Sequence, residues 1–272
     1  MSAAFDSRFL QHPAFSSFDG VSERLGALGH FPEPHELARL GPTSSGEEPP
    51  WFEFEPEDAT RVRAAGSFDR YIAASGRIPT RPGSYHDLCG ALVWLHFPCL
   101  KTAIHELQLS AQGSARGPRQ NAATHLDESG VLVLSSEFEV FHALVRLEWS
   151  ELFWQRRTEL LESTRFVGFG HGLLDALRAP HPGLLGMALF VLVSPAQLAL
   201  PPAQFRRLLD RELAPKLEDF LSRPAQLRPL PVLGVPGWAP GQAPEFYADQ
   251  RYFRRARMRP RPEAELAYLA LC

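Results

Sequence analysis

The stretch LLGMALFVLV, residues 184–193, is the longest apolar run in the chain. Its ten residues are too few for a membrane-spanning helix, which needs about 20. An apolar run of this length is typical of a buried β-strand. The sequence therefore predicts a buried strand here, as part of a small sheet.

Other segments add to this sheet. Residues 166–171 (FVGFGH) predict a second strand that runs into a helix at His171. Residues 124–135 (THLDESGVLVLS) place alternating or apolar residues on each side of a polar segment that ends in glycine, a pattern typical of a β-hairpin. Residues 229–238 (PLPVLGVPGW) are too rich in proline for a central strand and indicate an edge strand or an ordered loop.

Helical spacing is found in three other regions. Residues 56–76 have acids in the first turn and Gly76 as a stop signal. After a break at 78–84, apolar residues recur at helical spacing, and Pro98 ends one helix and begins the next. A further helix is predicted over 201–222, interrupted by Pro215.

The totals are those of a soluble globular protein: 272 residues, 44% hydrophobic and 22% charged. We find no internal repeat and no convincing linker. The predicted fold class is therefore α+β, a single mixed domain with several short helices, a β-hairpin and a small sheet. An extended N-terminal arm (1–56) packs on the core, followed by the main domain (57–262) and a C-terminal tail (263–272).

The charge and the cysteine content indicate which partners and which cellular compartment to expect. A net charge of −3 gives no overall attraction to nucleic acid or to an anionic membrane. The exception is the arginine-rich segment 251–261, which either contacts an anionic partner such as nucleic acid or is solvated and pairs with local acids. Three cysteines without metal spacing, no signal peptide and no membrane span predict a cytoplasmic protein with reduced thiols.

His86 and Asp87 stand at the start of a predicted helix. Ser84 as N-cap with Asp87 three residues later fits a capping pattern. The cap explains Asp87 and leaves His86 unexplained. His86 is therefore a candidate general base or metal ligand, with a structural role as the alternative.

Four further side chains are candidates, each with a structural alternative. Lys101 lies early in a helix, where the macrodipole disfavours a cation, so it either holds an anion or extends into solvent. Asp127 and Glu128 form a carboxylate pair suited to metal binding or acid–base chemistry, or they belong to the hairpin turn. His171 lies where a strand meets a helix, a place where ligand-binding groups gather, or it is a core histidine bonded to a backbone carbonyl.

Standard motifs for nucleotide binding and for well-known hydrolases are missing from the sequence: GxGxxG, GxxxxGK[ST], HExxH and GxSxG. No nucleotide cofactor is predicted, and the sequence leaves a divalent metal open.

Several separated motifs, in order, resemble the bacterial proteins grouped as domain-of-unknown-function family 3025. They are HDxxxALVWLxFPxxK (86–101), LDESGVLV (126–133), FGHGLL (169–174) and PLPVLGVPGW followed by FY (229–247). The resemblance implies a bacterial protein with a shared fold and assigns no activity. The pattern of that family has Trp and Asn where this chain has Tyr85 and Gly90. The positions that its motifs share with this chain include His86, Asp87, Lys101, Asp127, Glu128 and His171.

Two hypotheses follow for the function. In the first, the protein is a hydrolytic or phosphoester-directed enzyme that acts on a small-molecule or anionic ligand. His86 is the general base or a metal ligand, and His171 a second base or ligand. Asp127 or Glu128 is the carboxylate partner, and Lys101 stabilises an anion. In the second hypothesis, a non-catalytic binding or scaffold protein engages its partner through segment 251–261 or an aromatic groove. Substrate and oligomeric state stay open.

Overall fold

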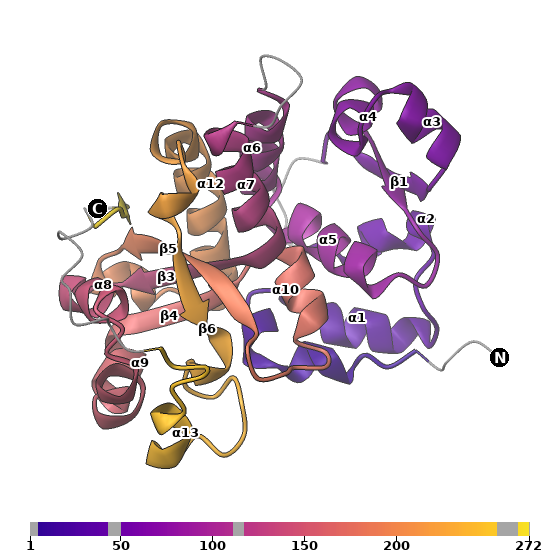
Figure 1. Cartoon of the computed structure of the whole chain (residues 1–272). Helices are drawn as coiled ribbons and strands as arrows, with labels where there is room; N and C mark the ends of the chain where they lie inside the picture. Colours follow the sequence, from indigo (N-terminus) through magenta and orange to yellow (C-terminus); the bar gives the residue numbers. More distant parts are fainter. Residues whose placement is uncertain (1–4, 43–49, 111–116, 255–265, 272) are drawn as a thin grey trace.

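Strand β5 (Leu185–Leu192) lies at the centre of the main sheet in this computed structural model, which describes residues 5–42, 50–110, 117–254 and 266–271 (Figure 1). Residues 188–191 are buried, as expected for an apolar strand covered on both faces. The predicted buried strand is confirmed.

The main sheet has five strands among the described residues, in the order β4-β3-β5-β6, with β7 also paired to β5. Strand β3 is parallel to β5 and antiparallel to β4, whereas β6 is antiparallel to β5. β6 is an edge strand, which agrees with its proline content. The bounds are β3 (Gly130–Ser135), β4 (Thr164–Gly168), β6 (Arg228–Pro231) and β7 (Leu269–Ala270).

Helices surround this sheet (Figure 1). In chain order those of the main part are α5 (Tyr85–His96), α6 (Pro98–Leu109), α7 (Pro118–Ser129), α8 (Phe138–Val145), a π-helix (Glu151–Gln155), α9 (Arg157–Ser163), α10 (His171–Ala176), α11 (Pro195–Leu198), α12 (Pro202–Phe220) and α13 (Pro244–Ala248). Pro98 begins α6, as predicted. Pro215 lies inside α12 without ending it.

A smaller unit precedes α5. Strands β1 (Glu53–Pro56) and β2 (Arg77–Thr80) form a parallel pair, connected by α3 (Ala59–Ala64) and α4 (Phe68–Ser75). The single helix predicted over 56–76 is thus two helices, because the chain breaks at Gly66 and Ser67 caps the second one. Gly76 ends α4 with φ of 67°, as its position predicted.

The N-terminal segment packs on the core through buried Phe15 and Phe18 and contains the short helices α1 (Val21–Leu28) and α2 (Pro34–Leu37). Part of the arginine-rich segment lies outside the described residues. Of its arginines the structure describes Arg251, which pairs with Asp249, and Arg254.

The α+β class is confirmed, but the β-hairpin predicted over 124–135 is wrong. Residues up to Ser129 form the last turns of α7, which passes directly into β3. Ala122, Ala123 and Leu126 are buried at helical spacing, so packing extends the helix through the polar residues that resembled a turn. Among the described residues, no helix has the length and apolar character needed to cross a membrane.

Candidate functional site

The sheet topology brings two segments together that are about 40 residues apart in sequence. Because β4 is antiparallel to β3, its last residue, Gly168, pairs with Val131 at the start of β3. The end of α7 therefore lies beside the start of α10. The backbone N–H groups of Phe169 and Gly170 both donate to the carbonyl of Gly130, at 3.0 and 2.8 Å, and tie the two junctions together.

Gly170 permits this close approach. A Cβ atom at position 170 would lie 2.2 Å from the backbone nitrogen of Gly130, closer than any real contact. The glycine therefore lets α10 begin directly against the end of α7. His171, the first residue of α10, is held beside Asp127 and Glu128 as a result.

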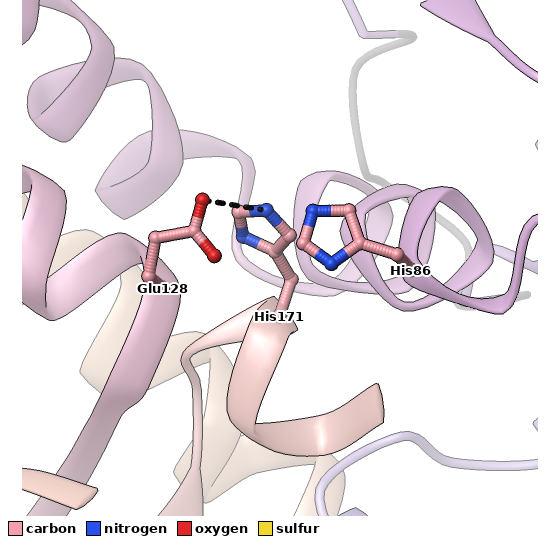
Figure 2. Close-up of side chains that lie close together, drawn as sticks. All are labelled: His86, Glu128 and His171. Atoms are coloured by element: carbon pink, nitrogen blue, oxygen red, sulfur yellow. Dashed lines mark ion pairs between the residues drawn. The ribbon is translucent and has the colours of Figure 1, made fainter. Parts of the chain in front are cut away.

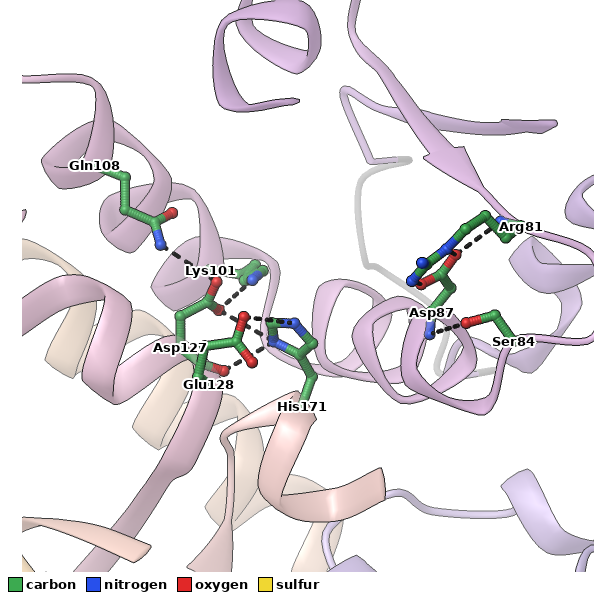
Figure 3. Close-up of polar contacts among 8 residues, drawn as sticks. All are labelled: Arg81, Ser84, Asp87, Lys101, Gln108, Asp127, Glu128 and His171. Carbon is green, nitrogen blue, oxygen red and sulfur yellow. Dashed lines mark hydrogen bonds and ion pairs between the residues drawn. The ribbon is translucent and has the colours of Figure 1, made fainter. Parts of the chain in front are cut away.

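His171 faces both carboxylates, each through a different ring nitrogen (Figure 3). Its Nδ1 lies 2.8 Å from the backbone carbonyl oxygen of Asp127 and 3.7 Å from the Asp127 carboxylate. Its Nε2 lies 3.6 Å from Oε1 of Glu128. A carbonyl oxygen only accepts hydrogen bonds, so Nδ1 carries a proton, and in the neutral form of the ring the lone pair lies at Nε2, toward Glu128.

His86 completes the cluster from a third element. It lies in the first turn of α5, which packs against α10, and its ring centroid is 4.6 Å from that of His171. Figure 2 shows His171 between Glu128 and His86. One potential ligand atom from each of the three residues lies within 4.8 Å of the other two. We call His86, Glu128 and His171 the three-residue cluster.

Glycines leave room around this cluster. A Cβ at Gly172 would lie 2.5 Å from Oε2 of Glu128 and 3.7 Å from Cε1 of His86. A Cβ at Gly90 would lie 3.8 Å from the His171 ring. Gly90, where the family resemblance has Asn, thus borders the site.

Beneath the cluster, Asp127 is buried together with Lys101, whose side chain is 6% exposed. The Lys101 ammonium donates to Oδ1 of Asp127, and the Gln108 amide donates to Oδ2 at 3.4 Å. Burial alone would raise the pKa of Asp127, but the positive charge of Lys101 and the neighbouring His171 together hold it well below its ordinary value. Asp127 is therefore a fixed anion that supports the Nδ1 side of His171.

The five sequence-predicted residues thus converge, in two layers. His86, Glu128 and His171 form a partly buried layer, and Lys101 with Asp127 a buried one. The expectation that Lys101 extends into solvent is wrong, as is the placement of Asp127 and Glu128 in a hairpin turn. Adjacent helical residues point about 100° apart, and the two carboxylates reach different ring nitrogens of His171.

Asp87 has the structural role that its position predicted. Its backbone N–H donates to Oγ of the N-cap Ser84 at 3.2 Å. Its carboxylate accepts hydrogen bonds from the Arg81 guanidinium and from the Arg81 backbone N–H (Figure 3). Burial would raise the pKa of Asp87, but the hydrogen bonds from Arg81 lower it overall. Asp87 therefore anchors the start of α5, the turn that holds His86.

Sequence reasoning missed Gln108 and Gly172. Gln108 lies seven residues after Lys101, so both side chains are on one face of α6. This spacing is the signal in the sequence that the two side chains can bind the same carboxylate. Gly172 follows the site histidine directly within GFGHG.

A separate cavity of about 990 Å³ lies between α6 and α12. None of the five site residues lines it. Its lining includes Trp51, Cys99, Arg206, Arg207 and Arg211. The three-residue cluster and this cavity are therefore at separate places in the molecule.

Fold and site define an α+β protein with a histidine–carboxylate cluster at one edge of its main sheet. The chain belongs to the family described as protein of unknown function (DUF3025), whose model matches residues 52–257. The match includes all five site residues. No curated protein and no solved structure matches the chain.

Proposed function

We propose that this protein is a hydrolytic enzyme that cleaves an ester or phosphoester at the three-residue cluster. The observation that carries the proposal is the convergence of two imidazoles and one carboxylate from three separate elements, α5, α7 and α10. These are the side chains that most often move protons in hydrolysis or hold the ion that activates water.

The polarity of the cluster suits activation of a water molecule. In the neutral form of His171 the Nε2 lone pair is directed toward Glu128, whose side chain is 46% exposed. A water molecule bound at this open side could lose its proton to the cluster and attack a carbonyl or phosphoryl centre. Asp127 and Lys101 act as positioning residues, because they are buried behind His171 and hold its neighbours in place.

The proposal is tested by turnover of the full chain on p-nitrophenyl esters, p-nitrophenyl phosphate and bis-p-nitrophenyl phosphate, each with added Zn²⁺ and with chelator. We expect release of p-nitrophenol from at least one class. His86→Ala should reduce kcat/KM at least about 100-fold, the usual contribution of a positioned proton-transfer group. The matched control is His35→Ala, an exposed histidine on α2.

Two outcomes would contradict the proposal. One is that no substrate on this panel is hydrolysed under either condition. The other is that His86→Ala, folded by circular dichroism, turns over as fast as His35→Ala, which would place any activity at another site.

The compartment is part of the same proposal. Among the described residues, Cys89 is a buried free thiol and Cys99 an exposed one. An exposed free thiol is typical of a reducing compartment, so we propose that the enzyme acts in the cytoplasm.

A further inference from the structure

We propose that His86, Glu128 and His171 bind one divalent transition-metal ion, and that this ion is Zn²⁺ in the hydrolytic enzyme. The inference deepens the proposed function, on which the choice of zinc rests. The site itself is argued from the positions of the three side chains.

The first support is the tautomer of His171. Its Nδ1–H donates to the backbone carbonyl of Asp127 at 2.8 Å, so Nε2 is the ring nitrogen available to an ion, and it is directed toward Glu128. Metal-binding histidines commonly donate their other ring N–H to a backbone carbonyl or a carboxylate in this way, which fixes the orientation of the ring. The buried Asp127 carboxylate, 3.7 Å from the same nitrogen, adds negative charge behind the ligand.

The second support is the contact between His171 and Glu128. Nε2 of His171 and Oε1 of Glu128 lie 3.6 Å apart, so both atoms can reach one ion placed between them. A cation there would be bound by a ring nitrogen and a carboxylate oxygen at once. Ligand atoms about 2.0 to 2.2 Å from a tetrahedral zinc lie about 3.3 to 3.6 Å from each other, so this pair is already at the required separation.

The third support is His86. It makes no hydrogen bond or ion pair with any residue that the structure describes, although its ring contacts that of His171. All three ligand atoms lie within 4.8 Å of one another, so small side-chain rotations bring the third ligand to the ion. Gly172 leaves the space between Glu128 and His86 unfilled by a side chain.

The ligand set decides the class of ion. Mg²⁺ and Ca²⁺ prefer oxygen ligands, whereas two imidazoles and a carboxylate suit Zn²⁺ or Fe²⁺. Three protein ligands that leave a coordination position open to solvent are the pattern of catalytic zinc sites, where bound water loses its proton near neutral pH. Glu128, with 46% of its side chain exposed, lies on the open side of this cluster.

The test is metal binding by the full chain after removal of metal with a chelator. Isothermal titration with Zn²⁺, with Fe²⁺ under anaerobic conditions and with Mg²⁺ should give one site for Zn²⁺ and much weaker binding of Mg²⁺. His86→Ala, Glu128→Gln and His171→Ala should each weaken Zn²⁺ binding at least about tenfold. His35→Ala and Glu139→Gln, which alter exposed residues elsewhere, should leave it unchanged.

Two results would overturn the inference: no stoichiometric Zn²⁺ or Fe²⁺ binding, or equal binding by the three cluster variants and the controls. His86→Ala is the decisive variant because His86 has no hydrogen bonds to lose on substitution. Co²⁺ gives a second readout, since its visible absorption reports coordination by the cluster and should change in Glu128→Gln. Preferred Fe²⁺ binding would support the site and overturn the assignment of zinc.

The metal site and the hydrolytic function fail separately. Tight Zn²⁺ binding without turnover on the ester and phosphoester panel would support the ion and reject hydrolysis. Turnover that persists undiminished in the chelator-treated protein would support hydrolysis and reject the ion as its cofactor.

Discussion

The role of each site residue follows from what its polar atoms contact. His171 is oriented from one side by the Asp127 carbonyl, so its other nitrogen is the reactive one. His86 has no such partner among the described residues and is oriented by its helix and by the His171 ring. Lys101 is held by Asp127, which removes it from direct contact with a substrate.

The Lys101–Asp127 pair gives the first prediction. In Asp127→Asn the buried ammonium loses its counter-charge, and we expect a loss of about 3 to 5 kcal/mol in the free energy of unfolding. Urea denaturation measures it, with Asp249→Asn as control because its partner Arg251 is exposed and such pairs contribute little. The double variant Lys101→Met/Asp127→Leu should recover most of the loss. A loss under about 1 kcal/mol in Asp127→Asn would contradict a buried ion pair.

Gly172 gives the second prediction. In Gly172→Ala the new methyl group displaces the Glu128 carboxylate, since its Cβ would lie 2.5 Å from Oε2 and 3.0 Å from the Glu128 carbonyl oxygen. We expect at least about tenfold weaker Zn²⁺ binding. Gly26→Ala in α1 is the control, because a Cβ there meets nothing within 4 Å. Unchanged affinity in Gly172→Ala would show that Glu128 is not a ligand in this position.

Two helix–strand junctions and one contact between helices bring the site residues together. Helix α7 leads directly into β3, and β4 leads into α10, so both helix ends meet at one edge of the sheet. Helix α5 packs on α10 and adds His86. The far end of α5 is fixed by His96, whose Nε2 donates to the carbonyl of Leu40 at 3.1 Å.

His96 gives a pH-dependent prediction. Burial, together with the positive charge of Arg206, lowers its pKa to about 3 from an ordinary 6.5. Between these values the unfolded chain binds a proton that the folded protein does not, so His96 stabilises the fold above pH 6.5 and loses that contribution as the pH falls. Its share of the slope is about 1.4 kcal/mol per pH unit.

The measurement is the free energy of unfolding by urea from pH 7 to pH 4. His96→Gln retains a donor for Leu40 but does not titrate, so it should show a shallower pH dependence than the wild-type protein. Parallel curves for the two proteins would show that His96 is not held neutral in the fold.

Local sequence patterns predict elements well where one segment carries the whole signal. The apolar run of β5 and the FVGFGH transition to α10 are such cases, and both are confirmed. The sequence of α7 resembles a hairpin because its buried residues are mostly small and it ends in the turn-like DESG. Its packing against α6 and α10 outweighs that local signal. The approach of His86 to Glu128 depends on packing between distant helices, which no local pattern contains.

At the scale of the whole molecule, the N-terminal segment and the main part share one core. The Phe18 ring, 5% exposed, contacts the rings of His96, the last residue of α5, and Phe97, which joins α5 to α6. The segment therefore supports the far end of α5 while the cluster uses the near end.

This shared core gives the fourth prediction. Phe18→Ala should lower the free energy of unfolding by about 3 to 5 kcal/mol, the usual effect of truncating a buried aromatic residue. Because the core is common, tryptophan fluorescence and far-UV circular dichroism should still report a single coincident transition. Two separate transitions would show that the N-terminal segment folds independently of the main part.

The metal site proposed above places one ion between His86, Glu128 and His171. Its most direct test is X-ray diffraction from crystals of the full chain grown with Zn²⁺, recorded at the zinc absorption edge. We predict an anomalous peak about 2.0 to 2.2 Å from a ring nitrogen of each histidine and from a carboxylate oxygen of Glu128. Zinc bound only elsewhere, with no peak at these three side chains, would rule out this metal site.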